Sequence, residues 1–139
     1  MTKAEMILWY GFMSWNCFLD IKKKEISITS CVLLGFVKTI GFLLEGQAEV
    51  QMLFVRSLPG IFFLAASILS KNAVGAGDGW IVLVSGWYLG VSVTMQSVGL
   101  GMFFLSLLGI LLLMMRKIRK NTEIPFVPFF FLGNLVVLL

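Results

Sequence analysis

The feature that most constrains this chain is a series of long apolar runs separated by very short polar stretches. A helix that crosses the hydrocarbon core of a bilayer needs about 17–25 apolar residues. Hydrophobic residues make up 59% of the chain and charged residues 13%, whereas soluble domains carry about 25% charged residues. A soluble domain of this size would have too few polar groups to cover its surface. The sequence therefore predicts an integral membrane protein, not a soluble enzyme or a disordered tail.

Six of these runs are expected to form transmembrane helices. They cover residues 4–19, 27–44, 50–69, 79–95, 97–115 and 124–139. Because the connections are brief, neighbouring helices should be antiparallel and closely packed. The predicted fold class is all-α, a bundle of six transmembrane helices with short loops that forms one membrane-embedded domain over residues 1–139. The break between the fourth and fifth runs is placed near Gln96.

Basic residues decide which loops are expected to face the cytosol. They follow the first, third and fifth runs: Lys22, Lys23, Lys24, Lys71, Arg116, Lys117, Arg119 and Lys120. The opposite loops carry Glu45 and Glu49. Since cytosolic loops are enriched in Lys and Arg, these three loops are predicted to lie in the cytosol, with both termini outside the cell membrane. The net charge of +4 therefore reflects topology, and the predicted partner is the lipid bilayer rather than nucleic acid.

Four residues inside the runs are assigned structural roles. Lys38 and Arg56 lie in the outer halves of their runs, and their side chains are expected to extend outward to the interface. Gly86 and Gly90 form a GxxxG pair in the fourth run. That spacing is common where two helices pack closely, so both glycines are expected to lie at a helix contact.

The chain contains no histidine, and this excludes several catalytic mechanisms. Ser-His and Cys-His nucleophilic catalysis and the HExxH zinc site all require that residue. Cys17 and Cys31 form no CxxC pair, so they are expected to be small packing residues. No cofactor is predicted.

The two aspartates of the chain are the strongest candidates for chemistry. Asp20 ends the first run and Asp78 opens the fourth. In a series of antiparallel spans, the end of an odd span and the start of an even span face the same side, so both carboxyls are placed at the cytosolic boundary. Ionisable residues at a membrane boundary are candidate functional residues. The alternatives are that Asp20 is a solvated charge or a partner of lysines 22–24, and that Asp78 caps a flexible connector.

Two carboxyls that lie close together in a medium of low dielectric constant suit hydrolysis. They do not both ionise easily, so one remains an anion that activates water while the other remains a proton donor. Asp78 also lies in the segment Gly75-Ala76-Gly77-Asp78-Gly79. Glycines lack a Cβ, so a peptide could approach this acid closely.

Three segments of the chain resemble the type IV prepilin peptidase family, the bacterial GxGD aspartyl proteases. These are Asp20 with the lysines and Ile26 that follow it, the GxGD at 75–78, and the PF-x-PF at 125–129, where Pro125 is expected to open the last helix and Pro128 to lie in its first turn. The resemblance implies catalytic roles for Asp20 and Asp78 alone. It also implies that the substrates are prepilins or pseudopilins, cleaved at the cytosolic face between a basic leader and an apolar helix.

The chain departs from the family at two positions. Ser27 replaces the usual Pro after Ile, and Trp80 replaces the usual Lys two residues beyond the second Asp. No segment is long enough for the cytosolic cysteine-containing insert of larger members, so a peptidase without N-methylating activity is predicted. Two other functions remain open: a non-enzymatic membrane protein whose acids carry protons or ions, and a homologue that binds prepilin-like helices without cleaving them.

Overall fold

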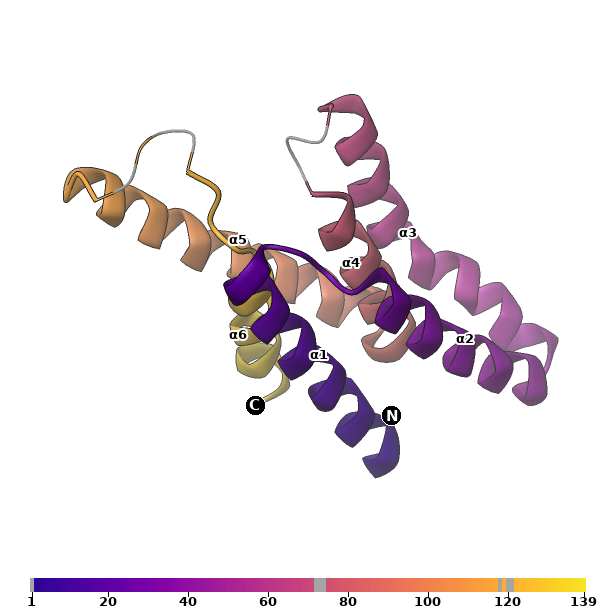
Figure 1. The fold of residues 1–139 in the computed structure, drawn as a ribbon. Coiled ribbons are helices and arrows are strands. Elements are labelled where there is room, and N and C mark those ends of the chain that lie inside the picture. Colours follow the sequence, from indigo (N-terminus) through magenta and orange to yellow (C-terminus); the bar gives the residue numbers. More distant parts are fainter. Residues whose placement is uncertain (1, 72–74, 118, 120–121) are drawn as a thin grey trace.

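The computed structural model describes residues 2–71, 75–117, 119 and 122–139. These residues form six α-helices and no strand, so the all-α prediction is confirmed (Figure 1). The helices are α1 (Lys3–Lys23), α2 (Ile28–Glu45), α3 (Gln47–Leu69), α4 (Ala76–Leu89), α5 (Val91–Met114) and α6 (Val127–Leu138). Lys120 and the side chain of Glu49, both named in the topology prediction, lie outside the described part.

Three of the helices are long and apolar enough to cross a membrane. They are α2, the segment Val50–Leu69 of α3, and α5. α4 has 14 residues and α6 has 12. At 1.5 Å per residue they are about 21 Å and 18 Å long, which is less than the roughly 30 Å of a hydrocarbon core. Length and composition therefore support three spans, and α4 is largely enclosed by other helices.

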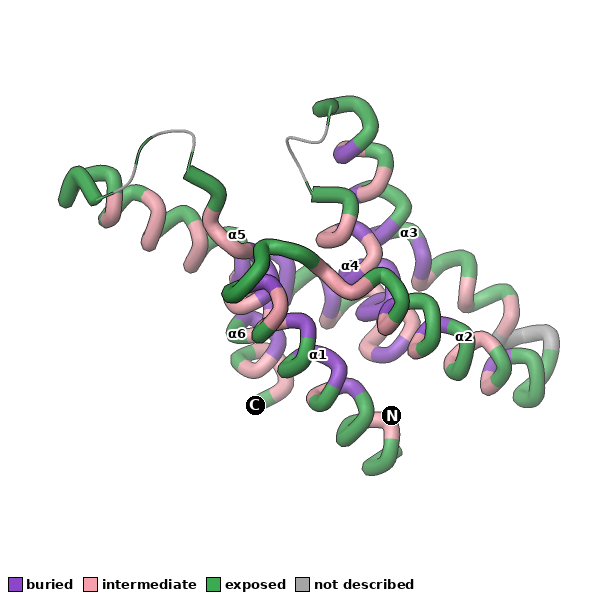
Figure 2. Tube along the Cα trace, viewed as in Figure 1, coloured by how far each residue is buried: buried purple, intermediate pink, exposed green. Residues whose placement is uncertain are grey.

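The outer surface of the molecule is apolar, as expected for a protein in contact with lipid. Large hydrophobic side chains are exposed along the helices that could span a membrane, with Leu44 83% and Leu69 85% accessible. Figure 2 shows the buried residues gathered where α1, α4, α5 and α6 meet, and exposed residues along the outer parts of α2, α3 and α5. A surface of this kind is not stable in water, so the predicted membrane environment is supported.

The break between α4 and α5 is not where the sequence analysis placed it. Gln96 lies inside α5, and the chain turns instead at Gly90, whose φ is +83°. Glycine adopts this conformation without strain because it has no Cβ. The prediction that Gly90 packs against a neighbouring helix is also wrong, since a Cβ built there would meet no atom within 4 Å.

Glycines on α3 and α4 allow these two helices to pack very closely. A Cβ on Gly86 would lie 2.0 Å from the carbonyl oxygen of Arg56. A Cβ on Gly60 would lie 2.2 Å from the Cβ of Leu83. Gly86 thus has the packing role predicted for it. This contact fixes the position of α4, which carries Asp78 at its first turn.

A buried hydrogen-bond network joins α1, α5 and α6. The Trp9 indole N–H donates to the Asn134 side-chain oxygen at 3.3 Å, and the Asn134 amide lies 3.4 Å from the Ser97 hydroxyl. All three residues are fully buried. Polar pairs of this kind hold helices together where lipid supplies no hydrophobic driving force between them.

Lys38 and Arg56, which were expected to extend outward to the interface, both have partners within the protein. The Lys38 ammonium forms an ion pair with Glu5 and lies over the ring of Phe42, 5.3 Å from its centroid. The Arg56 guanidinium lies over the same ring and donates to the carbonyl of Trp87 at 3.4 Å. Trp87 is in the last turn of α4, where a cation also complements the helix dipole.

Candidate active site

Asp20 lies in the last turn of α1, with its side chain almost fully buried at 5% exposure. Its Oδ2 atom accepts a hydrogen bond of 2.8 Å from the backbone N–H of Val127. Among the described residues Asp20 forms no ion pair with lysines 22–24. The carboxyl therefore belongs to the interior of the helix assembly, which argues against a solvated loop charge.

The donor to Asp20 is the first residue of α6. Phe126 occupies the N-cap position, Val127 begins the helix and Pro128 follows it, so the prediction that Pro125 opens the helix is wrong by two residues. Proline is accepted in the first turn because N–H groups there have no partner within the helix. The free N–H of Val127 is thus available to the Asp20 carboxylate, and the helix dipole favours negative charge at the same place.

Aromatic packing holds this helix start in place. The ring of Phe126 stacks on Phe130 with centroids 5.7 Å apart and lies 6.4 Å from the ring of Phe63 of α3. Phe126, Val127 and Phe130 are all buried. In the PF-x-PF segment, the group that contacts Asp20 is the backbone N–H of Val127. A backbone contact of this kind is one that no residue type reveals.

Asp78 lies in the first turn of α4 and is partly buried. Its backbone N–H donates to the carbonyl of Gly75 at 3.1 Å, and its side chain does not cap the helix. No hydrogen bond to its carboxyl is found among the described residues. Asp78 is therefore not the N-cap that the alternative interpretation required.

The glycines around Asp78 serve packing as well as access. A Cβ on Gly77 would lie 3.0 Å from Ile26, and a Cβ on Gly79 would lie 2.8 Å from Leu64. Gly75 is exposed, and a Cβ there would lie 3.1 Å from the Asp78 carboxyl oxygen. Gly75 thus leaves room for the Asp78 carboxyl, Gly77 for Ile26 of the α1–α2 turn, and Gly79 for Leu64 of α3.

The structure places Asp20 close enough to Asp78 for its charge to act on the Asp78 carboxyl. The turn after α1 contacts the start of α4 through Ile26 and Gly77. Both acids lie outside the apolar runs 4–19 and 79–95. Burial raises the pKa of Asp78 to about 7, and the negative charge of Asp20 raises it in the same direction. Burial also raises the pKa of Asp20, but the hydrogen bond from Val127 opposes that shift.

Asn16, which the sequence analysis missed, fixes the turn that follows Asp20. It lies one helical turn before Asp20 and is fully buried. Its side-chain oxygen accepts from the Ser27 N–H at 3.1 Å, and its amide donates to the Ser30 hydroxyl at 3.1 Å. The available signal was a polar residue four positions before the acid, and therefore on the same helix face.

Substitution of Asn16 with Ala is expected to destabilise the protein by about 1–3 kcal/mol, because the partly buried N–H of Ser27 loses its acceptor. Thermal unfolding in detergent measures the change. The matched control is Ser30→Ala, which removes the hydroxyl that accepts from the Asn16 amide and donates to the Ser27 carbonyl, but keeps the bond from the Ser27 N–H to Asn16. Equal stability of the two variants would contradict the role assigned to Asn16.

The two departures from the prepilin peptidase pattern have local structural explanations. Ser27 caps α2, since its hydroxyl accepts from the Ser30 N–H at 3.3 Å. Its own N–H donates to Asn16, a bond that Pro could not form. Trp80 packs as a partly buried side chain against the hydrophobic core.

An apolar groove of about 300 Å³ lies between α1 and α2, lined by Leu8, Phe12, Trp15, Ser30, Leu33, Leu34 and Val37.

Within the described residues, no group of three or more His, Cys, Asp or Glu side chains could hold a metal ion. Cys17 is partly buried and Cys31 is buried, and both are free thiols, which agrees with packing roles.

Comparison of the chain with protein-family models, curated proteins and solved structures finds no significant match. The arrangement of Asp20, Asp78 and the start of α6 is therefore the feature that bears on function.

Proposed function

We propose that the protein is an intramembrane aspartic endopeptidase that removes the short basic leader of prepilin-like substrates. The observation that carries the proposal is that two neighbouring carboxyls have different environments. Asp20 accepts a backbone hydrogen bond, whereas burial and the charge of Asp20 raise the pKa of Asp78 to about 7. Pairs of acids whose environments separate their pKa values supply a base and an acid at one site. The resemblance of three segments to prepilin peptidases supports the same function.

The proposed reaction is the hydrolysis of one peptide bond. A water oxygen bonds to the carbonyl carbon while one water proton passes to the ionised aspartate, and the protonated aspartate gives its proton to the carbonyl oxygen. The C–N bond then breaks, the first aspartate returns its proton to the leaving nitrogen, and the second recovers a proton from the geminal diol. Both acids end as they began, so no further reactant is consumed.

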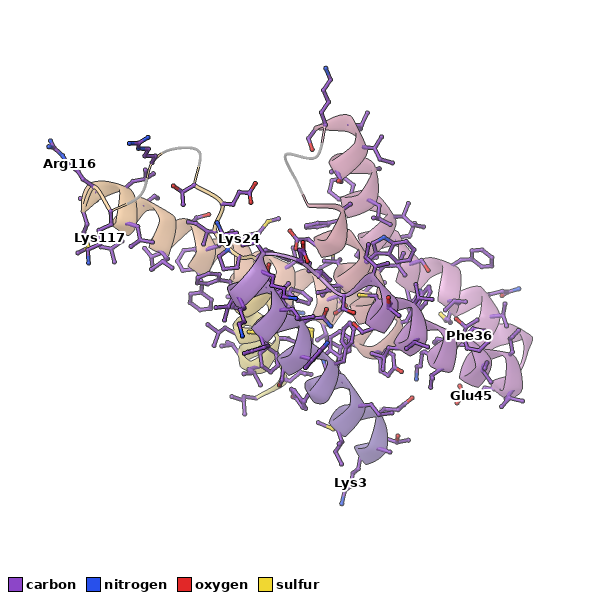
Figure 3. The ribbon with its side chains drawn as sticks, in the orientation of Figure 1. Lys3, Lys24, Phe36, Glu45, Arg116 and Lys117 are labelled. Atoms are coloured by element: carbon purple, nitrogen blue, oxygen red, sulfur yellow. The ribbon has the colours of Figure 1, made fainter. Side chains whose placement is uncertain are left out.

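The proposed topology places this site at the cytosolic border of the cell membrane. All six helices would form the embedded domain, with α4 and α6 packed among the longer helices. In Figure 3, Arg116 and Lys117 lie at the left of the molecule and Lys24 near its centre, whereas Lys3 lies at the bottom and Glu45 at the lower right. An end rich in Lys and Arg is the one expected to face the cytosol. Both termini would then lie outside.

The substrate class follows from the resemblance and suits the surface around the site. A prepilin carries an apolar helix directly after its leader. The groove between α1 and α2 is lined by apolar side chains that such a helix could contact. The groove reaches Ser30, which is bonded to Asn16, one turn from Asp20. The bond to be cut must leave the helical conformation first, because helical carbonyls are occupied by their own hydrogen bonds.

The test is to place the purified protein in vesicles with a synthetic peptide that joins a basic leader to an apolar helix. Mass spectrometry is expected to show two fragments separated at the junction. A peptide that crosslinks to the protein but stays intact would instead indicate a binding homologue. Proton flux across the vesicles without cleavage, recorded by a pH-sensitive dye, would indicate the non-enzymatic alternative.

A further inference from the structure

The two acids of the site differ in one contact that the sequence does not reveal. Asp20 accepts the N–H of Val127, at the positive end of the α6 dipole. Among the described residues, no donor contacts the carboxyl of Asp78, which lies in the partly buried first turn of α4. A hydrogen bond from a backbone N–H stabilises the ionised form of a carboxyl relative to the protonated form.

We infer that the Val127 N–H selects Asp20 as the ionised member of the pair, so that Asp20 takes the proton from water and Asp78 supplies the proton to the substrate. This inference rests on the proposed function and adds the assignment of the two roles. Val127 is a positioning residue, because it acts through Asp20 and touches no reacting atom. The aromatic packing of Phe126 keeps the N–H at this place.

Among the described groups around Asp20, the N–H of Val127 is the one that donates a hydrogen bond to its carboxyl. On α6 the neighbours of Val127 are the apolar Phe126 and Pro128. On α4 the titratable group is Asp78, whose pKa the negative charge of Asp20 raises, so that Asp78 stays protonated while Asp20 is ionised. On α1 itself, Cys17 lies one turn earlier, and the Lys24 N–H bonds the backbone carbonyl of Asp20 rather than its carboxyl.

The test replaces the Val127 amide with an ester by incorporating 2-hydroxyisovaleric acid at position 127. This change removes the N–H and keeps the isopropyl side chain. The rising limb of the pH profile for leader cleavage is expected to move upward by roughly one pH unit, since two or three such bonds lower a carboxyl pKa by about two units. An unmoved limb in an active, folded ester variant would overturn the inference.

The matched control is the same ester change at Phe129, whose N–H donates to the Phe126 carbonyl at 3.1 Å in the same turn. It weakens the start of α6 without touching Asp20. A purely structural role for Val127 predicts that both esters lower the amount of folded protein and leave the pH profile unchanged. The inference predicts a shifted profile for the Val127 ester alone.

A measurement on the unmodified protein covers the case in which the ester variant does not fold or the peptide is not cleaved. The amide proton of Val127 is expected to shift in the NMR spectrum as Asp20 ionises, and to lose that response in Asp20→Asn. A Val127 signal that ignores pH would overturn the inference. A signal that follows pH in a protein that cleaves no leader would keep the Val127 contact and reject the proposed peptidase.

Discussion

Replacing either Asp20 or Asp78 with Asn is expected to reduce leader cleavage by about a thousandfold or more. Proton transfer by a positioned side chain contributes about 10²–10⁴-fold to a rate, and each substitution removes one of the two transfers. Asn has the shape of Asp, so packing around α1 and α4 should be preserved. The measurement is the initial rate of fragment release in vesicles, compared with the wild type.

The matched controls are Glu25→Gln and Glu123→Gln. Both glutamates are exposed, and both lie in connections predicted to face the cytosol with the aspartates. These variants are expected to retain the wild-type rate. Cleavage that survives both aspartate substitutions, or that is lost equally in the glutamate variants, would reject the roles assigned to Asp20 and Asp78.

Loss of activity in Asp78→Asn should not reflect loss of the fold. The pKa of Asp78 rises from 3.8 to about 7 in the folded protein, so folding favours the protonated acid. Its favourable contribution to stability is therefore complete below pH 3.8 and is lost as the pH rises through 7. Asn cannot ionise, so the variant should unfold at a temperature at least as high as the wild type at pH 8.

The second large effect is expected from adding a methyl group where α3 and α4 pack closely. Gly86→Ala would bring a Cβ to 2.0 Å from the carbonyl oxygen of Arg56, and Gly60→Ala would bring one to 2.2 Å from the Cβ of Leu83. Because the Arg56 contact is with backbone, the helices themselves must separate. Overpacking typically costs about 1–3 kcal/mol and more in rigid sites, so each variant is expected to lose at least about 3 kcal/mol.

Thermal unfolding in detergent measures this loss, and Gly99→Ala provides the control. A Cβ on Gly99, inside α5, would meet no atom within 4 Å. Ala is favoured over Gly in a helix by about 1 kcal/mol, so the control should be as stable as the wild type or more stable. If Gly86→Ala and Gly99→Ala unfold at the same temperature, the close approach of α3 and α4 is wrong.

Much of the fold follows from patterns that the sequence displays directly. Apolar runs predict the helices because a buried or lipid-facing segment must satisfy its backbone hydrogen bonds internally. Counting the helices between Asp20 and Asp78 predicts that both lie at the same end of the assembly, whereas their approach depends on how the α1–α2 turn packs against α4. The break at Gly90 could not be located this way, since the turn depends on one residue with positive φ inside an uninterrupted apolar stretch.

The parts that could not be predicted depend on contacts between distant segments. The N–H of Val127 reaches Asp20 across 107 positions of the chain, and a backbone donor leaves no mark in residue type. Lys38 was expected to reach the interface. Its ion pair with Glu5 could not be predicted, because the two residues belong to different helices. Ser27 looked like a departure from a pattern, but its N–H is needed by the buried Asn16.

The most direct test of a shared aspartate site uses the fact that the chain contains only these two aspartates. Protein labelled with ¹³C at the aspartate carboxyls should give two NMR signals, which Asp20→Asn and Asp78→Asn assign. Asp78 is expected to titrate near pH 7, and Asp20→Asn is expected to lower the Asp78 midpoint by removing a neighbouring negative charge. An Asp78 midpoint near 3.8, or one that Asp20→Asn leaves unchanged, would contradict a shared aspartate site.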